Sequence, residues 1–399
     1  MHSLKLKIKE AATKYLPETI AIRRHFHAHP ELSFEEINTS NFIASKLKEY
    51  QIPFTQGIVK TGIIALIEGK NPSKKTIAIR ADMDALPIIE TNDCEYKSKN
   101  EGVMHACGHD VHSASLLGAA KILNELKNSF EGTVKLIFQP GEEKLPGGAS
   151  LMIKEGILEN PPVTSIFAQH VFPSMEAGKV GFRNGMYMAS TDEIYLTVIG
   201  KGGHAAMPSD YNNPLLIASG ILLELNNTFM LQSYPTPTVL AFGKIAGNGA
   251  TNVIPDEVKI EGTFRTMDEQ WRKEAHLKMK NIAETIAIKM GGKCDVRIEH
   301  GYPFLINDET TTNLARKAAE DYLGKENVEE LPMRMTAEDF AFFSQKVPAC
   351  FYRLGTANKL KGITSGVHTS TFDIDEKALE VATGLLAWLV INELNAPVH

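Results

Sequence analysis

Short apolar runs alternate with helix-length segments through the first half of the chain, and this alternation limits the possible folds more than any other feature. Residues 76–82, 133–139 and 165–169 are apolar runs of strand length, and residues 113–127 place apolar side chains along one side at helical spacing. Residues 2–28 and 35–50 also show helical spacing. Strands that alternate with helices predict an α/β domain with a mostly parallel sheet and helices on both faces.

A different pattern begins at about residue 185. Residues 258–265 alternate apolar and polar side chains, which is typical of a sheet with one buried and one exposed face. Predicted strands at 194–199 and 238–245 and predicted helices at 214–227 and 269–290 surround them. An order of strand, helix, strand, strand, helix and strand within about 110 residues is that of a ferredoxin-like α+β domain.

The alternation of helices and strands returns after about residue 300 and ends in a predicted helix at 375–394. A chain of 399 residues is too long for one ordinary core, so two domains are expected. The sequence therefore predicts a metal-binding catalytic domain of residues 1–184 and 301–399. An inserted satellite domain of residues 185–300, with a lid or dimerisation role, interrupts it.

Composition excludes several classes of partner. The formal net charge is -6, and no clustered Lys and Arg suggest a nucleic-acid partner. No apolar run reaches the roughly 20 residues that span a bilayer, and the charged N-terminus does not read as a secretory signal. The four cysteines are scattered as free thiols would be, which predicts a reducing compartment and so a cytoplasmic protein.

Potential metal ligands follow several predicted strands. Cys107 and His109 lie in a glycine-containing loop before a helix, and the pair Glu142-Glu143 follows the strand 133–139. His170 follows the strand 165–169, and His368 precedes the last helix. Because loops at the carboxyl edge of a parallel sheet converge on one crevice, we expect these side chains to meet.

The mixture of thiolate, imidazole and carboxylate suits Zn²⁺ or Mn²⁺, with Co²⁺ or Ni²⁺ as alternatives. Five ligands exceed one tetrahedral site but suit two divalent ions that share a bridging group, for which Cys107 is the candidate. Neighbouring glutamates cannot face one ion in the same way, so we assign Glu143 to the metal and Glu142 to proton transfer. Taken singly, each residue also has a structural explanation: a buried cysteine, a structural histidine or a solvated Glu-Glu pair.

Seven motifs along the chain resemble one enzyme family. The chain resembles the amidohydrolase branch of the aminoacylase/carboxypeptidase metallopeptidases, whose members include hippurate hydrolase, N-acetyldiaminopimelate deacetylase and indoleacetyl-amino-acid hydrolases. The resemblance runs from about Arg23 to the last helix. The motifs are Arg80-Ala81-Asp82-Met83-Asp84-Ala85-Leu86-Pro87, His105-Ala106-Cys107-Gly108-His109-Asp110, Gln139-Pro140-Gly141-Glu142-Glu143, Gly202-Gly203-His204-Ala205-Ala206-Met207-Pro208, Thr251-Asn252-Val253-Ile254-Pro255, Gly262-Thr263-Phe264-Arg265-Thr266 and Glu338-Asp339-Phe340.

The resemblance implies the same five ligands (Cys107, His109, Glu143, His170 and His368) and Glu142 as the base. It further implies that His204 reaches a neighbouring subunit's site to stabilise the tetrahedral oxyanion. Asn252 and Arg265 would clamp the substrate's α-carboxylate, which an arginine fork matches well. Without the resemblance, Arg265 would be interpreted as part of a surface salt bridge and His204 as an ordinary loop histidine.

The chain departs from other branches of the superfamily at one motif. Those branches have a His-x-Asp ligand motif where this chain has Asp82-Met83-Asp84. Asp82 is therefore not assigned as a ligand, whereas Asp84 and Asp110 are candidates for orienting ligands. The sequence assigns no role to His105.

These features predict a two-metal amidohydrolase, a homodimer or a higher homo-oligomer, that cleaves the amide bond of small N-acyl-L-amino acids. A metallo-dipeptidase or carboxypeptidase acting on small peptides is the nearer alternative. A non-catalytic binding protein on the same fold is the more distant one.

Overall fold

The protein divides into two units in a computed structural model that describes residues 1–396. The first unit contains Met1–Gly185, Ile306–Pro332 and the chain from Asp339 onward, and the second contains Met186–Leu305 and Met333–Glu338. The segment Met333–Glu338 belongs to the second unit, although the predicted boundaries place it in the catalytic domain. The reason is a β-bridge between Arg334 and Met188, next to which the Arg334 carbonyl accepts a hydrogen bond from the Ala189 N–H (3.2 Å).

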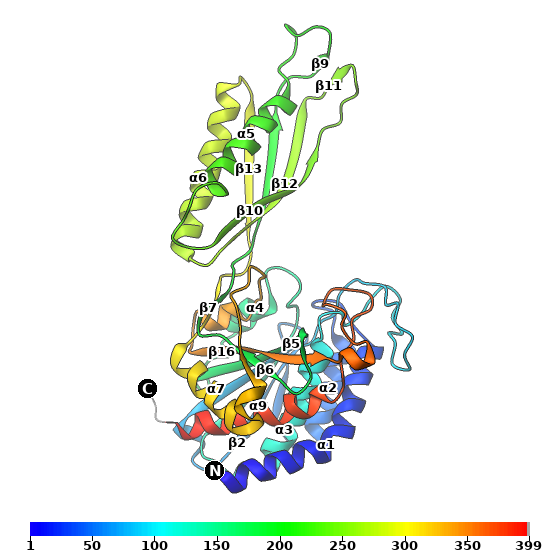
Figure 1. The fold of residues 1–399 in the computed structure, drawn as a ribbon, viewed down its shortest axis with the longest axis vertical. Helices are drawn as coiled ribbons and strands as arrows, with labels where there is room; N and C mark the ends of the chain where they lie inside the picture. Colours follow the sequence, from blue (N-terminus) through cyan, green and yellow to red (C-terminus); the bar gives the residue numbers. More distant parts are fainter. Residues whose placement is uncertain (397–399) are drawn as a thin grey trace. The chain divides into compact units, whose positions relative to one another are not determined.

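An eight-stranded sheet forms the centre of the first unit (Figure 1). Its strand order is β1-β2-β4-β3-β5-β16-β6-β15. The four central strands are mutually parallel, and antiparallel pairs are found toward both edges. Central parallel strands are covered on both faces, which explains why every residue of β3, β4 and β16 is buried. The strands are β1 (Phe54–Ile58), β2 (Gly62–Glu68), β3 (Thr76–Asp82), β4 (Thr133–Gln139), β5 (Ser165–Glu176), β6 (Val180–Phe182), β15 (Val328–Glu330) and β16 (Ala349–Ala357).

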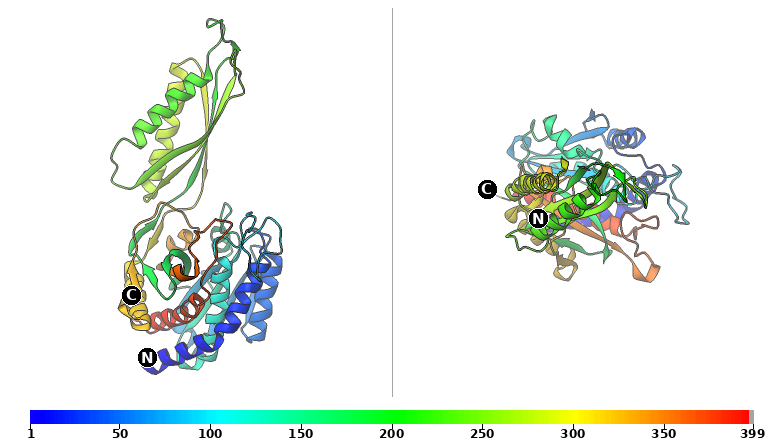
Figure 2. Two further views of the ribbon diagram at one scale, coloured as in Figure 1. Left: turned by 45° about the vertical axis from the view of Figure 1, so that its right-hand side comes forward. Right: turned by 90° about the horizontal axis from the view of Figure 1, so that it is seen from above.

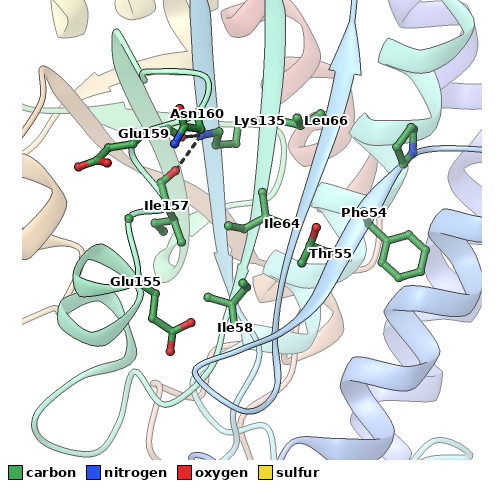
Figure 3. A pocket seen from close by; sticks show the side chains of 12 residues that line it. Phe54, Thr55, Ile58, Ile64, Leu66, Lys135, Glu155, Ile157, Glu159 and Asn160 are labelled. Carbon is green, nitrogen blue, oxygen red and sulfur yellow. Dashed lines mark hydrogen bonds between the residues drawn. The ribbon is translucent and has the colours of Figure 1, made fainter.

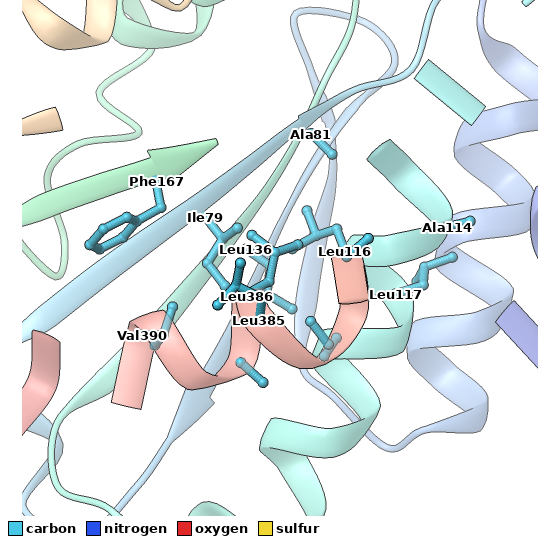
Figure 4. Packing of buried hydrophobic residues seen from close by; sticks show 14 of the residues in the cluster. Ile79, Ala81, Ala114, Leu116, Leu117, Leu136, Phe167, Leu385, Leu386 and Val390 are labelled. Atoms are coloured by element: carbon cyan, nitrogen blue, oxygen red, sulfur yellow. The ribbon is translucent and has the colours of Figure 1, made fainter. Parts of the chain in front are cut away.

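One face of this sheet packs on the long helices of the unit. Ile79 and Ala81 of β3 point toward Leu116 and Leu117 of α3, and toward α9, in the main hydrophobic core (Figure 4). Nearly every residue of α3 and α9 is buried, since both lie in the middle of the helical layer. The helices are α1 (His2–Ala28), α2 (Ile37–Glu49), α3 (His109–Glu125), α4 (Gly148–Lys154), α7 (Glu309–Leu323), α8 (Ala341–Ser344) and α9 (Ala378–Asn395).

The other face of the sheet carries polar groups near α4 and α8. Arg80 alternates with Ile79 along β3 and therefore points to this face. Its guanidinium donates to Gln139 Oε1 (2.8 Å) and to Asp339 Oδ1 (2.7 Å), and the Ala149 N–H of α4 donates to Asp339 Oδ2 (3.0 Å). The predicted arrangement of helices on both faces of a mostly parallel sheet is confirmed.

The second unit is a ferredoxin-like domain. Its four strands form an antiparallel sheet in the order β10-β12-β8-β13, and α5 and α6 pack on one face of it around a separate core (Figure 1 and Figure 2). A two-stranded ribbon, β9 with β11, extends from this sheet. The strands β7 (Gly185–Met188) and β14 (Leu305–Asn307) each contain a boundary between the two units in the sequence. The elements are β8 (Asp192–Ile199), β9 (Gly203–His204), α5 (Pro214–Phe229), β10 (Thr238–Ala246), β11 (Val253–Ile254), β12 (Glu257–Thr266), α6 (Glu269–Lys289) and β13 (Lys293–His300).

Two element boundaries differ from the predicted ones and bear on the site. Helix α3 begins at His109 and not at residue 113, and β5 continues through His170 to Glu176 where a strand of residues 165–169 was predicted. None of the helices within residues 1–396 is long and apolar enough to cross a bilayer.

Candidate metal centre and active site

The strand register brings the predicted ligand segments to one level of the sheet. Asp82 at the end of β3 pairs with Gln139 at the end of β4, and Arg80 pairs with Ala168 of β5. His170 lies two residues beyond Ala168 and is thus level with both strand ends. The loop after β4 carries Glu142 and Glu143. The prediction that His170 follows its strand is wrong, because β5 runs on beside β16 past the end of β3.

All five predicted ligands lie together. The donor atoms of Cys107, His109 and His170 are within 4.8 Å of one another, and so are those of Cys107, Glu143 and His368. Cys107 Sγ is 3.4 Å from His170 Nε2, and Glu143 Oε1 is 3.2 Å from His368 Nε2. Only Cys107 belongs to both of these groups, which is the position that a bridging ligand requires.

Local backbone geometry presents these ligands. Gly108 has φ +83°, and a Cβ there would lie 2.6 Å from Val171 Cγ2, so this close turn between Cys107 and His109 requires glycine. His368 has φ +62°, and its N–H donates to the carbonyl of Ala106 (2.7 Å). This hydrogen bond ties the His368 loop to the loop that carries Cys107.

Hydrogen bonds to carbonyl groups select the histidine tautomers. His109 Nδ1 lies 2.9 Å from the Asp84 carbonyl, and His170 Nδ1 lies 2.9 Å from the Val171 carbonyl. Because a carbonyl only accepts, each Nδ1 carries the proton and each Nε2 is left to bind a cation. His109 Nε2 and Glu143 Oε1 are buried, lie 4.0 Å apart and have no hydrogen-bond partner within residues 1–396. A divalent cation bound in each of the two donor groups would satisfy these atoms.

The electrostatics of the cluster also fit divalent cations. Burial, together with the charges of Glu143 and Glu142, raises the pKa of the Cys107 thiol well above its usual range. Burial lowers the pKa of His109, but the carboxylates of Asp82, Asp84 and Glu143 outweigh burial and raise it to about 10. Burial and Arg353 lower the pKa of His170, which keeps it neutral as a ligand must be. A cation would stabilise the thiolate and take the place of the proton on His109.

Asp84 links two of the ligand segments. Its Oδ1 lies 3.2 Å from His109 Nδ1, and its Oδ2 accepts hydrogen bonds from the Glu143 N–H (3.0 Å) and from Ser33 Oγ (2.6 Å). Burial raises the pKa of Asp84, but the hydrogen bonds from His109 and Ser33 lower it below its usual value. Asp84 is therefore an ionised carboxylate that orients His109 and the backbone of Glu143.

Sequence reasoning missed His112, which supports the same cluster. The Val171 N–H donates to His112 Nε2 (3.0 Å), so His112 donates from Nδ1 to Asp82 Oδ1 (2.6 Å). Its ring lies against that of His170, with 4.7 Å between the ring centroids. Asp82 Oδ2 is 3.7 Å from His109 Nε2. The signal in the sequence was the spacing of three residues between His109 and His112, which places both on the first turn of α3.

Glu142 is buried beside the ligands. A carboxylate oxygen of Glu142 and the donor atoms of His109 and Glu143 lie within 4.8 Å of one another. Glu142 Oε1 accepts a hydrogen bond from the Asp339 N–H (3.3 Å). A carboxylate in this position is within reach of a water molecule held at the metal centre.

The side chain of Asp110 contacts residues of α1 and not the predicted ligands. Its Oδ2 accepts from Arg23 Nε (2.7 Å) and lies 2.8 Å from His27 Nδ1, and all three side chains are fully buried. Asp110 thus joins α1 to the start of α3 and does not contact the neighbouring ligand. His105 is also buried, and burial lowers its pKa to about 4.

We expect Asp110→Ala to destabilise the protein by about 3 kcal/mol, because it leaves the buried Arg23 without its nearest carboxylate. Burial raises the pKa of Asp110, but Arg23 and His27 outweigh it and hold this pKa well below its usual value. The stabilisation is therefore complete above the unfolded-state pKa of about 4 and is lost as the pH falls further. Urea denaturation measures the effect. Asp373→Asn, at the half-buried partner of Arg23, should cost less than about 1 kcal/mol.

The three predicted site residues of the second unit, catalytic His204 and substrate-binding Asn252 and Arg265, separate into two places. His204 of β9 pairs with Val253 of β11, and the Ala205 N–H donates to the Asn252 carbonyl (3.1 Å), so His204 and Asn252 are neighbours. This ribbon lies next to the Glu257 end of β12, where the Gly200 N–H donates to the Asp256 carbonyl (2.9 Å).

Arg265 lies at the other end of β12, eight residues from Glu257, which corresponds to about 26 Å of strand. It is half-buried, and burial lowers its pKa. Its Nη1 donates to the Met335 carbonyl (3.2 Å). Asn252 and Arg265 of one chain are thus too far apart to bind the same carboxylate.

A separate cavity of about 370 Å³ lies at the β1–β2–β4 edge of the first unit and contains no predicted site residue (Figure 3). Ile58, Ile64 and Leu66 line it. Lys135 donates from Nζ to the carbonyls of Ile157 (2.8 Å), Glu159 (2.6 Å) and Pro161 (2.8 Å). This lysine therefore anchors the loop after α4.

Comparison with known proteins agrees with the geometry. The chain is 38% identical over 370 residues to N-acetyl-L-cysteine deacetylase from Bacillus subtilis (strain 168), with 92% of this chain and 86% of the relative covered. It is 37% identical over 393 residues to thermostable carboxypeptidase 2 from Saccharolobus solfataricus, with 98% of each covered. The crystal structure of the Bacillus subtilis YXEP protein, a dinuclear metal-binding peptidase of the M20 family, matches with a TM-score of 0.82 and 34% identity. That match covers 96% of this chain and 100% of that chain.

The family model for peptidase family M20/M25/M40 matches residues 78–392. This range contains every predicted ligand, and the resemblance carried by the sequence motifs is confirmed. The chain therefore belongs to peptidase family M20/M25/M40 and is a hydrolase of that family.

Proposed function

We propose that the protein hydrolyses the amide bond of small N-acyl-L-amino acids with the help of two divalent ions, Zn²⁺ or Mn²⁺, with Co²⁺ or Ni²⁺ as alternatives. The observation that carries this proposal is the position of Glu142, a buried carboxylate beside two groups of metal-binding side chains that share Cys107. The name of the deacetylase relative supports an acyl-amino-acid substrate, and that of the YXEP protein supports a dinuclear centre.

The side chains have two roles in this proposal, metal binding and proton transfer. Cys107, His109, Glu143, His170 and His368 would hold the ions, with Cys107 as the bridge. When bound, divalent ions lower the pKa of a water molecule that they hold and polarise the acyl oxygen of the substrate. Glu142 accepts the proton of the attacking water and delivers it to the departing amine nitrogen. The products are a carboxylate and a free amino acid.

Two chains would complete one site. Following the family resemblance, we assign stabilisation of the oxyanion to His204 and binding of the substrate's α-carboxylate to Asn252 and Arg265. Because His204 and Asn252 lie at the opposite end of β12 from Arg265, one chain cannot bring all three to a substrate of a few ångströms. One subunit would therefore provide Arg265, and its partner would provide His204 and Asn252.

The surface of the second unit supports a homodimer. The side chains of Leu216 and Leu223 on α5 are 62% and 65% exposed, and the neighbouring strand β10 is an edge strand with a single charged residue, Lys244. Exposed leucines beside an open strand edge are typical of a surface that another chain covers. We propose that a second copy of this protein covers it.

A mixing experiment tests the shared site. His204→Ala and Arg265→Ala should each be inactive alone. After the two variants are mixed and allowed to exchange subunits, about a quarter of the wild-type rate should return. Half of the dimers are then mixed, and one of their two sites has all its groups. If all three residues acted from a single chain, no rate would return.

The nearer alternative is a metallo-dipeptidase or carboxypeptidase, which the name of the Saccharolobus relative favours. Turnover of N-acetyl amino acids compared with free dipeptides, with each of the four metals, separates the two. Faster cleavage of dipeptides would replace the proposed function. The four cysteines are free, as a cytoplasmic protein requires, and we propose that location.

A further inference from the structure

A short segment before α2, Ser33 to Glu36, contacts Asp84 and the loop after β4, which carries Glu142 and Glu143. Glu36 is a fully buried carboxylate at the start of α2, and the mechanism does not use it. Oε1 accepts hydrogen bonds from the N–H groups of Phe34 (2.8 Å) and Gly141 (2.8 Å), and Oε2 accepts one from Thr61 Oγ1 (2.8 Å). Glu36 therefore joins its own segment, the β1–β2 turn and the loop after β4.

The loop after β4 has little freedom at Gly141. This glycine has φ +61°, and a Cβ there would lie 2.4 Å from Cζ of Phe34. The ring of Phe34 thus closes over Gly141, while Glu36 holds its N–H. Together these contacts fix the backbone immediately before Glu142.

A second buried carboxylate fixes the backbone immediately after Glu142. The Glu143 N–H donates to Asp84 Oδ2 (3.0 Å), and Ser33 Oγ donates to the same oxygen (2.6 Å). The residues on either side of Glu142 are thus held by two carboxylates, one supplied by the segment Ser33 to Glu36 and the other oriented by it.

We propose that Glu36 is a positioning residue for the hydrolytic reaction. By accepting the Gly141 N–H, it fixes the backbone conformation that sets the direction in which the side chains of Glu142 and Glu143 project from the loop. This inference rests on the proposed function, in which these two glutamates are base and ligand. An error of about 1 Å in the placement of a reacting group can cost about 100-fold in rate. A residue that holds the base therefore affects turnover without touching the substrate.

Three variants test the role of the carboxylate. Glu36→Ala leaves two buried N–H groups and the Thr61 hydroxyl without their acceptor. Glu36→Gln keeps an oxygen for both N–H groups, and its amide can donate to Thr61 Oγ1. Glu36→Asp keeps the charge but withdraws the acceptor by one methylene, and replaces Glu36→Ala if that variant does not fold.

Glu31→Ala is the matched control. The Glu31 carboxylate accepts from the Asn38 N–H (3.1 Å), the Thr39 N–H (2.9 Å) and Thr39 Oγ1 (3.0 Å), so it holds the same segment between α1 and α2 that Glu36 holds through the Phe34 N–H. Its side chain contacts neither ligand loop. Loosening of the segment between α1 and α2 is therefore common to both variants, and loss of loop position belongs to Glu36 alone.

Hydrogen exchange of the peptide covering residues 137–147 measures the loop without any substrate. Glu36→Ala, or Glu36→Asp in its place, should exchange at least about 10-fold faster there. It should bind Zn²⁺ about 10-fold more weakly or worse on dialysis, and show about 100-fold lower kcat at little changed KM. Glu36→Gln and Glu31→Ala should stay within about threefold of wild type in all three measurements.

Wild-type exchange, Zn²⁺ binding and kcat in Glu36→Ala would overturn the inference. So would equal losses in Glu31→Ala, or a Glu36→Gln variant as impaired as Glu36→Ala. If the wild-type protein cleaves no acyl-amino acid or dipeptide, the proposed function fails. The exchange and Zn²⁺ measurements then still decide whether Glu36 positions the loop.

Discussion

Glu142→Gln should lower turnover by about 10²–10⁴-fold and leave the metal content unchanged. The substitution keeps the size of the side chain and an oxygen that can accept the hydrogen bond from the Asp339 N–H. It removes the group that accepts a proton from the attacking water. A positioned general base contributes about 10²–10⁴-fold to the rate, so kcat should fall by that factor with little change in KM.

Glu143→Gln is the matched comparison for Glu142→Gln. The two residues are neighbours of the same type, but Glu143 lies 3.2 Å from His368 Nε2 and 4.0 Å from His109 Nε2. Glu143→Gln should therefore lose metal as well as turnover, measured by elemental analysis of the purified protein. If Glu142→Gln also lost metal, or if it stayed active while fully loaded, the assignment of the two roles would be wrong.

Cys107→Ala should lower the metal content from two ions per chain to one or none. Cys107 is shared by the two groups of donor side chains, so its removal weakens both positions at once. Replacing a residue that only supports a ligand costs about 10–100-fold in metal affinity, and loss of the bridge should exceed that. Turnover should fall with the metal and should not return at high Zn²⁺ concentration.

Cys94→Ala serves as the control for Cys107→Ala. Cys94 is a free, half-buried thiol that belongs to neither donor group. The Cys94→Ala protein should keep two ions per chain and the wild-type rate. A Cys107→Ala protein that kept both ions would show that the thiolate is not the bridge.

The sequence by itself determined the architecture and the candidate donor side chains. Strand-length apolar runs and helical spacing depend on local periodicity, so β3 and β4 have the predicted bounds, and the βαββαβ order identified the ferredoxin-like insertion. The candidate ligands also follow from residue type, because a thiol, imidazoles and carboxylates that occur together near strand ends form a set that suits divalent cations.

The tertiary structure alone decided the surroundings of those donors. Helix α3 begins with His109, Asp110 and His112, which are polar residues buried by neighbouring elements, so apolar spacing could not show its first turn. The strand β5 continues past His170 because β16 is beside it to accept its hydrogen bonds. Neither partner is visible in the local sequence.

Contacts between residues far apart in the sequence could not be predicted either. Glu36 reaches Gly141 across 105 positions, and Arg23 reaches Asp110 across 87. In the sequence these residues are a glutamate before a helix and an arginine within one. Only the packing of α1 and α2 beside the strand ends gives them partners, because the pairing of buried polar groups depends on three-dimensional distance and not on residue type. The same reason explains why Asn252 and Arg265, plausible as a pair from their chemistry, lie at opposite ends of one domain.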